Sequence, residues 1–364
     1  MSAGICNERA TPPSAKRTSQ ILLVILDGLL SVTEILSTHT PALFAAAVRR
    51  ASELLRQGEV VALPTETVYG LAANALDARA VARIFEIKGR PAHNPIIVHV
   101  ASQSLAERCV KAWPPLAAQL ARAFWPGPLT LVLPKAPGIP DNVTAGGDTV
   151  GVRWPSHPFI QAVIRECDFP LAAPSANLSN YVSPTNAEHV RHQLDGKIPL
   201  IVDGGHSQVG IESTVLDLVG TPPTVLRPGM IHRESLAAVC GTLRVNPGPT
   251  SETLRSPGLL KKHYSPKAKT VILRWTDDPH LVRQLVAYGV PLERCFVIVH
   301  SRIPNVEKLG AVNIIPHDAE AFARALYAEL YRCDATGAGL IVVEAPPETP
   351  EWSAIADRLR RASA

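Results

Sequence analysis

Short apolar runs rich in β-branched residues alternate with helical patterns along most of this 364-residue sequence. The runs predict strands at 59–63, 94–100, 129–133, 149–154, 200–203 and 214–219, and the segments between them predict helices at 41–57, 77–88, 157–167 and 186–194. Strands that alternate with helices are typical of α/β proteins, in which helices cover a sheet. We therefore predict an α/β domain that ends near residue 245.

A second alternating region follows a segment, 246–268, that is rich in Pro, Ser, Gly and charge and lacks an apolar period. Such a composition predicts a linker. Beyond it, the strand-like runs VILRW, CFVIVH and GLIVVEA alternate with helical stretches near 279–288, 318–332 and 351–361. This order predicts a smaller, doubly wound, Rossmann-like sheet. The predicted parts are an N-terminal extension at 1–35, a larger α/β domain at 36–245, the linker at 246–268 and a C-terminal domain at 269–364.

The composition is that of a folded globular protein, with 46% apolar and 19% charged residues and a formal charge of +4. Lys and Arg form no dense basic run, so the sequence gives no strong signal for nucleic-acid binding. Six cysteines lie far apart without a CxxC pair, which favours free thiols in a reducing cytoplasm. The apolar stretch 21–30 contains Asp27 and is shorter than the ~20 residues that span a bilayer, so we expect no membrane association.

A cluster of polar residues directly follows the predicted strand at 59–63. It contains the hydroxyl groups of Thr65, Thr67 and Tyr69, and ligands of open α/β sheets bind at such strand ends. The hydroxyl groups suit a small polar substrate, but hydroxyl side chains also commonly satisfy the backbone of their own turn. The cluster by itself leaves both interpretations open.

Two cations, Lys88 and Arg90, stand at the end of the predicted helix 77–88. The helix dipole favours cations there without any ligand. Lys as a point charge and Arg as a bidentate fork also bind phosphate oxygens. The pair alone does not decide between these two interpretations.

Further polar side chains lie along or after other predicted strands. Ser175 and Asn177 follow an apolar run, and the nearby Ser183 could either bind phosphate or cap the next helix. Arg153 and Ser213 lie along predicted strands, where a polar side chain needs a partner. The sequence contains no P-loop, GxSxG elbow, HExxH or kinase signature, so any phosphate chemistry uses another scaffold.

In this order, the motifs PTETVYGL, KGRP with NPIIVH, FWPGPLTLVL, VGVRWP, PSAN, ESTV and LRPG resemble those of the YrdC-like family of threonylcarbamoyl-AMP synthases. The resemblance runs from about residue 41 to 240. The linker PGLLKKHYSP and the α/β segment after it resemble the two-domain form of the family. This implies a YrdC-like twisted mixed sheet with flanking helices and a deep cleft, plus a smaller doubly wound Rossmann-like domain.

The resemblance implies a nucleotidyltransferase that converts L-threonine, bicarbonate and ATP into threonylcarbamoyl-AMP and pyrophosphate. This is the first step of the threonylcarbamoyladenosine modification of tRNA beside the anticodon. The implied partners are the machinery that later transfers the threonylcarbamoyl group to tRNA and, weakly or indirectly, tRNA itself. Mg²⁺ is expected with ATP, and no protein metal site is expected, because the sequence lacks an obvious carboxylate cage.

The resemblance also implies roles for individual residues. The catalytic tetrad would be Lys88, Arg90, Ser175 and Asn177. The ATP contacts would be Arg90, Asn94, Thr149, Ser175, Ser183, Arg227 and Tyr264, and the threonine contacts would be Thr67, His99, Arg153, Ala173 and Ser213. Ala173 stands where some relatives carry a hydroxyl residue. Because Tyr264 lies in the linker, the linker would fold over the cleft as a lid that excludes water.

Two other interpretations compete with the synthase. A non-catalytic RNA-binding module of the same fold is disfavoured, because aromatic residues make up 5% of the chain and give few surfaces for base stacking. A carbamoyl-transferring domain of hydrogenase maturation shares the fold but normally accompanies zinc-finger segments. Their cysteine spacings are missing here.

Overall fold

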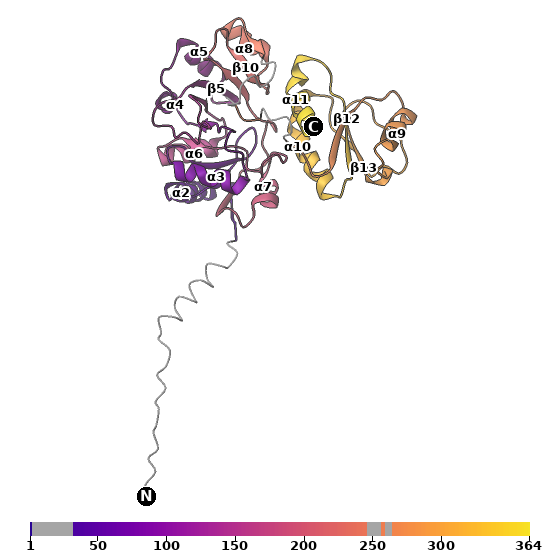
Figure 1. Cartoon of the computed structure of the whole chain (residues 1–364), viewed down its shortest axis with the longest axis horizontal. Helices are drawn as coiled ribbons and strands as arrows, with labels where there is room; N and C mark the ends of the chain where they lie inside the picture. Colours follow the sequence, from indigo (N-terminus) through magenta and orange to yellow (C-terminus); the bar gives the residue numbers. More distant parts are fainter. Residues whose placement is uncertain (2–31, 246–255, 259–263) are drawn as a thin grey trace. The chain divides into compact units, whose positions relative to one another are not determined.

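The computed structural model describes residues 1, 32–245, 256–258 and 264–364. Met1–Val32 and Thr33–Ala364 are separate units, and the second is compact and carries two sheets (Figure 1). Its first strand, β1, begins at Glu34, so the last two residues of the predicted extension already belong to a sheet. The predicted linker falls between β11, which ends at Val245, and β12, which begins at Lys269. Much of that linker, 246–255 and 259–263, lies outside the described residues.

The larger sheet has eleven strands among the described residues, in the order β1-β8-β2-β3-β7-β4-β6-β5-β9-β10-β11. They are β1 (Glu34–Ser37), β2 (Val61–Leu63), β3 (Gly70–Asn74), β4 (Val98–His99), β5 (Leu129–Pro134), β6 (Thr149–Arg153), β7 (Leu171–Ala172), β8 (Leu200–Asp203), β9 (Thr214–Asp217), β10 (Thr224–Arg227) and β11 (Arg244–Val245). Parallel pairs such as β1 with β8 stand beside antiparallel pairs such as β2 with β3. The predicted mixed sheet is therefore confirmed.

Helices flank this sheet, and several of them begin at a residue whose side chain accepts a hydrogen bond from the first turn. They are α2 (Pro41–Arg56), α3 (Ala78–Lys88), α4 (Gln103–Cys109), α5 (Pro115–Phe124), α6 (Pro158–Cys167), α7 (Ala187–Leu194) and α8 (Arg233–Cys240). Asp77 accepts from the backbone N–H groups of Arg79 and Ala80, as the sequence predicted, and Gly89 ends α3 with φ of 58°. Asn186 caps α7, so Ser183 is free of the capping role that the sequence left open.

The smaller sheet is wholly parallel, in the order β12-β15-β13-β14. Its elements are β12 (Lys269–Leu273), α9 (Asp278–Val286), η1 (Leu292–Arg294), β13 (Cys295–Val299), β14 (Ala311–Ile314), α10 (Ala319–Ala335), β15 (Leu340–Glu344), η2 (Pro350–Trp352) and α11 (Ser353–Ala362). Val342 packs with Leu281 of α9, whereas its neighbour Val343 packs with Leu326 of α10 and Ile355 of α11. Helices thus cover both faces (Figure 1), which confirms the doubly wound prediction.

The strand predicted at 94–100 is wrong in its extent, because β4 contains two residues, Val98 and His99. Pro95 has no N–H group for a sheet hydrogen bond. The carbonyl groups of Asn94 and Pro95 accept from the Arg90 side chain instead, at 3.0 and 2.6 Å. This segment is therefore shaped by a buried arginine before it enters the sheet.

No helix in the described part of the chain is long and apolar enough to cross a membrane. The described cysteines, which exclude Cys6, are free thiols.

Candidate functional site

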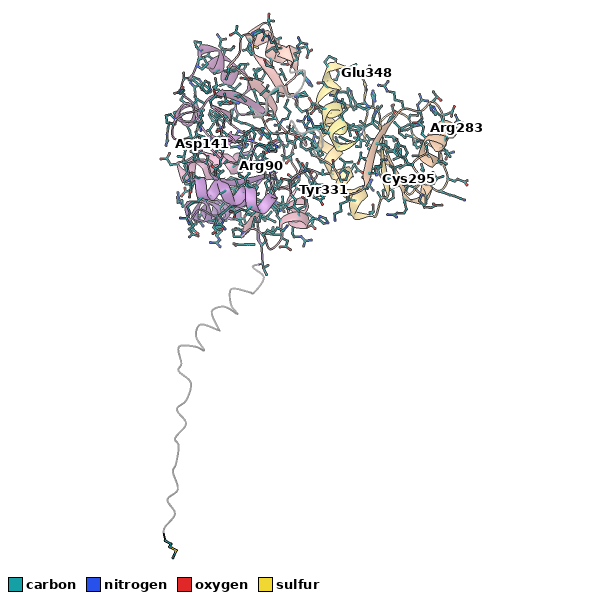
Figure 2. The ribbon with its side chains drawn as sticks, in the orientation of Figure 1. Arg90, Asp141, Arg283, Cys295, Tyr331 and Glu348 are labelled. Carbon is teal, nitrogen blue, oxygen red and sulfur yellow. The ribbon has the colours of Figure 1, made fainter. Side chains whose placement is uncertain are left out.

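A cavity of about 50 Å³ lies at the ends of several strands of the mixed sheet. The predicted site residues that line it are Thr67, Arg90, His99, Arg153, Ala173, Ser175, Ser213, Arg227 and Tyr264. It is also lined by Thr65, Val68, Gly70, Ile97, Pro174, Glu212, Pro257 and Gly258. Figure 2 shows Arg90 inside the part of the chain that carries the mixed sheet.

Strand pairing brings these distant residues together. His99 of β4 stands opposite Arg153 of β6 in a parallel pair, and Gly70 forms an isolated bridge with Ser175. An added Cβ atom at Gly70 would lie 3.3 Å from the Ala173 Cβ atom, so the β2–β3 turn approaches the loop after β7 closely. The sheet therefore converts four separate sequence motifs into one site.

The hydroxyl groups in the turn between β2 and β3 have two roles: some bond to the backbone, and one bonds to a side chain of the cavity. Thr65 Oγ1 donates to the Val68 carbonyl at 2.6 Å, and the Tyr69 hydroxyl donates to the Gly205 carbonyl at 2.7 Å. Both therefore have structural partners, although Thr65 also lines the cavity. Thr67 Oγ1 instead accepts from Arg153 Nη2 at 2.9 Å. Thr67 is thus the hydroxyl group that the turn presents to the cavity arginine.

Arg153 forms a buried ion pair with Glu66. Its Nη2 atom lies 2.7 Å from Glu66 Oε1, and both side chains are about 5% exposed or less. Neither Glu66 oxygen has an aligned hydrogen-bond donor within the described residues. The contact therefore acts through charge, and it leaves lone pairs on Glu66 unused.

Two residues that line the cavity carry a buried polar atom without a hydrogen-bond partner in the described chain, Arg153 Nε and His99 Nδ1. Asn94 Oδ1 is also buried without a partner, but Asn94 is not among the lining residues. Burial, and then the charge of Arg153, lowers the pKa of His99 to about 3, so its imidazole is neutral at neutral pH. Native proteins rarely leave such atoms unsatisfied, so Arg153 Nε and His99 Nδ1 are atoms to which a polar ligand would bind in the cavity.

The lysine of the predicted tetrad braces a loop. Lys88 Nζ donates to the Ser175 carbonyl at 2.6 Å and also to the Asn177 carbonyl. Lys88 is 2% exposed and is not among the cavity-lining residues. Burial, and then the charge of Arg90, lowers its pKa well below the usual value. Contact between Lys88 and phosphate stays a prediction, and the geometry shows that it holds the Ser175 loop.

Arg90 and Arg227 place cationic groups at the cavity. Burial lowers the pKa of Arg90 to about 10, which keeps it charged at neutral pH. Arg227 Nη2 donates to Ser213 Oγ at 3.1 Å, and its Nη1 donates to the Pro257 carbonyl at 3.2 Å. Ser213 Oγ also lies 2.8 Å from Thr130 Oγ1. Arg227 therefore joins a strand end to the described part of the linker.

Described linker residues close one side of the cavity. Tyr264 is 1% exposed and adopts φ of 61°, in the left-handed region. Gly258 has φ of 82°, and an added Cβ atom would lie 2.4 Å from the Tyr264 hydroxyl. A glycine is therefore required where the linker passes the tyrosine.

Other predicted residues lie outside the cavity lining. Thr149 lines a smaller neighbouring cavity of about 10 Å³ together with Pro257. Ser183 donates to Glu212 Oε1 at 2.6 Å, and Glu212 lines the main cavity. Asn177 Nδ2 donates to the Leu178 and Tyr181 carbonyls, each at 2.8 Å, so it shapes its own loop.

The prediction missed Glu66 and Glu212, although both lie inside the motifs PTETVYGL and ESTV. It also missed Tyr327 and Arg358, whose side chains contact Glu212. No sequence pattern marks these last two residues. A buried carboxylate beside a predicted ligand residue was the signal that could have identified Glu66 and Glu212.

The described residues contain no group of three His, Cys, Asp or Glu side chains that could hold a metal ion. The cavity lining is instead rich in arginine, which suits anionic groups. The residues that line the cavity therefore fit anionic ligands.

Two family models match the chain. A model described as telomere recombination, for Sua5, YciO and YrdC proteins, matches residues 53–229. A model described as the C-terminal domain of threonylcarbamoyl-AMP synthase matches residues 231–364. The two matches meet near the start of α8.

Relatives named threonylcarbamoyl-AMP synthase match over most of their length. A threonylcarbamoyl-AMP synthase from Pyrococcus abyssi is 42% identical over 321 residues, which cover 87% of this chain and 94% of that protein. One from Bacillus subtilis is 42% identical over 341 residues, 92% of this chain and 96% of that protein. The crystal structure of P. abyssi Sua5 in complex with L-threonine matches with a TM-score of 0.83 at 40% identity, over 91% of this chain and 97% of that chain.

Proposed function

We propose, from the premise that this chain belongs to the family of threonylcarbamoyl-AMP synthases, that it converts L-threonine, bicarbonate and ATP into threonylcarbamoyl-AMP and pyrophosphate. The reaction is a nucleotidyl transfer. The observation that carries the proposal is the set of unused polar atoms around Arg153 in a cavity lined by three arginines.

The Arg153 side of the cavity suits threonine. The Arg153 guanidinium group is a fork for the carboxylate, and its unpartnered Nε donor fits one carboxylate oxygen. Thr67 and Ser213 carry hydroxyl groups suited to the threonine side chain, and His99 offers a neutral imidazole. A neutral His99 avoids adding a further charge where the threonine amine must be uncharged to react.

The Arg90 and Arg227 side suits the nucleotide. The threonine amine attacks bicarbonate or CO₂, which gives a carbamate and releases water in the bicarbonate case. A carbamate oxygen then attacks the α-phosphorus of ATP, and the bond to the β-phosphate oxygen breaks as pyrophosphate leaves. Fixed cations that face the phosphates stabilise the charge that builds on them, and the step requires no covalent bond to the protein.

Lys88 acts through the Ser175 loop in this proposal. Its Nζ atom donates to two loop carbonyls, and this places the half-buried Ser175 at the cavity. Mg²⁺ enters as the ATP complex, with ligands from phosphate and water, because the described residues offer no metal cage.

We also propose that the product passes to the machinery that transfers the threonylcarbamoyl group to tRNA, and that the enzyme works in the cytoplasm. Contact with tRNA is weak or indirect in this proposal. The formal charge of +4 over 364 residues supports no extended tRNA surface.

The test is pyrophosphate release by the purified full chain with ATP, Mg²⁺, L-threonine and bicarbonate, and with each substrate omitted in turn. We expect release that requires threonine and bicarbonate, and threonylcarbamoyl-AMP by mass spectrometry. Ser175→Ala should reduce the rate, whereas Ser156→Ala should not, because Ser156 is exposed and lies outside the cavity lining. Absence of threonine-dependent release, together with tight RNA binding, would favour the RNA-binding module.

A further inference from the structure

A buried network joins the cavity wall to helix α11. Glu212, 7% exposed, lines the cavity, and its Oε2 atom accepts from Arg358 Nε at 2.7 Å. Arg358 Nη2 also donates to the Glu212 backbone carbonyl at 3.2 Å. Arg358 is 1% exposed, so its charge is compensated by protein groups rather than by water.

The same network holds two residues that the sequence assigned to ATP. Ser183 Oγ donates to the second carboxylate oxygen of Glu212 at 2.6 Å. The guanidinium carbon of Arg358 lies 5.4 Å from the centre of the Tyr264 ring, within cation–π range. Tyr327 of α10 stacks on Tyr264 at 5.8 Å between ring centres and donates to Glu212 Oε2 at 3.1 Å.

We propose that Arg358 is a positioning residue for ATP: it fixes Glu212 and Tyr264, and through Glu212 it fixes Ser183, without touching the substrate itself. This inference rests on the proposed function. It gives the C-terminal region a defined part in the reaction, because a side chain of α11 contacts Glu212 and Tyr264, which line the cavity.

The charges around Glu212 explain why an arginine is needed. Burial by itself would raise the pKa of Glu212, but the charge of Arg358, the charge of Arg227 and the hydrogen bond from Ser183 hold it at about 2. Tyr264 from the linker and Tyr327 from α10 also face this carboxylate. Asp357 of α11 adds a negative charge beside Arg358, and this charge is shared with Arg361.

Removing Arg358 therefore takes away the guanidinium group that is paired with Glu212, and leaves the carboxylate with Ser183, Tyr327 and the charge of Arg227. The ionised carboxylate would then repel the phosphates more strongly, and Tyr264 would lose its contact with the Arg358 guanidinium group. With its strongest cationic partner gone, Glu212 would also have a raised pKa, because burial favours the neutral acid.

The experiment compares Arg358→Met with Arg360→Met in the full chain. Arg360 lies on the same helix but is exposed, so its variant controls for the substitution. We expect Arg358→Met to lower kcat/KM for ATP by about tenfold or more, mainly through KM, with a smaller change for threonine. Arg358→Lys should recover part of the loss, because it restores charge without the fork.

Two further readouts separate positioning from folding. In Arg358→Met, kcat/KM for ATP should fall as pH rises from about 5 to 8, as Glu212 ionises, relative to wild type. The double variant Glu212→Gln/Arg358→Met should recover part of the ATP binding, measured by calorimetry, and lose this pH dependence, because a neutral amide needs no cation whereas Tyr264 still lacks its contact with Arg358. This double variant also serves if Arg358→Met fails to fold.

An active wild type with an ATP KM and pH profile unchanged in Arg358→Met would overturn the positioning role and leave the proposed function intact. If the double variant Glu212→Gln/Arg358→Met binds ATP no better than Arg358→Met does, that result would also overturn the positioning role. An inactive wild type would instead contradict the proposed function.

Discussion

Two buried arginine–glutamate pairs contribute to the cavity, and they differ in how completely they are satisfied. Glu212 receives hydrogen bonds from Arg358, Tyr327 and Ser183. Glu66 lies near Arg153 but receives no aligned hydrogen bond in the described chain, and Arg153 Nε is unpartnered as well.

The difference indicates that the Glu212–Arg358 pair supports the cavity lining, whereas the Glu66–Arg153 pair is able to bind a ligand. A buried ion pair stabilises a fold only when its remaining donors and acceptors are satisfied, and this holds for Glu212 with Arg358. The Arg153 pair keeps unused polar atoms, and their desolvation cost is offset only when a ligand arrives. We therefore expect substitutions at Arg153 to affect threonine most, and substitutions near Glu212 to affect ATP and stability.

The largest expected effect is that of Arg153→Met. The substitution removes the carboxylate fork and leaves Glu66 as an uncompensated buried charge. We expect kcat/KM for threonine to fall by more than about 100-fold, in line with the cost of breaking a buried charge pair. Steady-state kinetics against the exposed control Arg122→Met measures this, and a loss confined to ATP would contradict the division of the cavity.

The next effect concerns pH, because the pKa values of His99, beside Arg153, and of Glu212, beside Arg358, are lowered from different ordinary values. The pKa of His99 beside Arg153 is lowered to about 3, so its neutral form contributes stability above its unfolded value near 6.5. That stability is lost as pH falls below 6.5 toward 3, because the unfolded chain takes up the proton first. The pKa of Glu212 is also lowered, from 4.5 to about 2, and its contribution is lost only below 4.5.

Between pH 7 and 5, therefore, His99 should reduce stability before Glu212 does. We expect the wild type to lose about 2 kcal/mol of unfolding free energy through His99 as pH falls over this range. His99→Gln should lack this contribution, whereas the exposed-residue control His39→Gln should retain it. Urea unfolding at both pH values measures the difference, and equal pH dependence in all three proteins would show that His99 is not held neutral.

Glu66→Gln tests whether the negative charge of Glu66 is needed to orient Arg153 for threonine binding. The amide keeps the shape of the carboxylate but removes the charge that orients Arg153. We expect the KM for threonine to rise by about tenfold, as for the loss of one charged contact, with little change for ATP. The exposed control is Glu53→Gln, and an unchanged threonine KM would show that Thr67 alone orients Arg153.

The smallest expected effect is that of Tyr327→Phe, which removes one of several donors to Glu212 and keeps the ring against Tyr264. Because Arg358 and Ser183 still bind the carboxylate, we expect a loss of about 1 kcal/mol in unfolding free energy and less than a threefold rise in the ATP KM. Urea unfolding and kinetics, with Tyr181→Phe as control, measure both. A rise in the ATP KM as large as that of Arg358→Met would show that the position of Glu212 depends on the Tyr327 hydroxyl group.

Much of the fold was accessible from local patterns. Asp77 and Gly89 bound α3 as capping chemistry requires, and the apolar runs at β5, β8 and β13 were placed within a residue or two. Shorter strands escaped prediction. For example, β3 reads GLAAN and has none of the β-branched residues that mark a strand, and it forms because β2 and β7 pair with it.

The sequence alone determined the α/β class, the order of a larger and a smaller alternating region, and the motif residues such as Arg153, Thr67 and Ser213, because strand periodicity and motif order are local properties of the chain. Only the tertiary structure decided that Lys88 braces a loop, that Glu66 and Glu212 are buried beside arginines, and that Arg358 reaches Glu212 across 146 positions. The physical reason is that a buried charge finds its partner by distance in space, and such pairing leaves no periodic mark in the sequence.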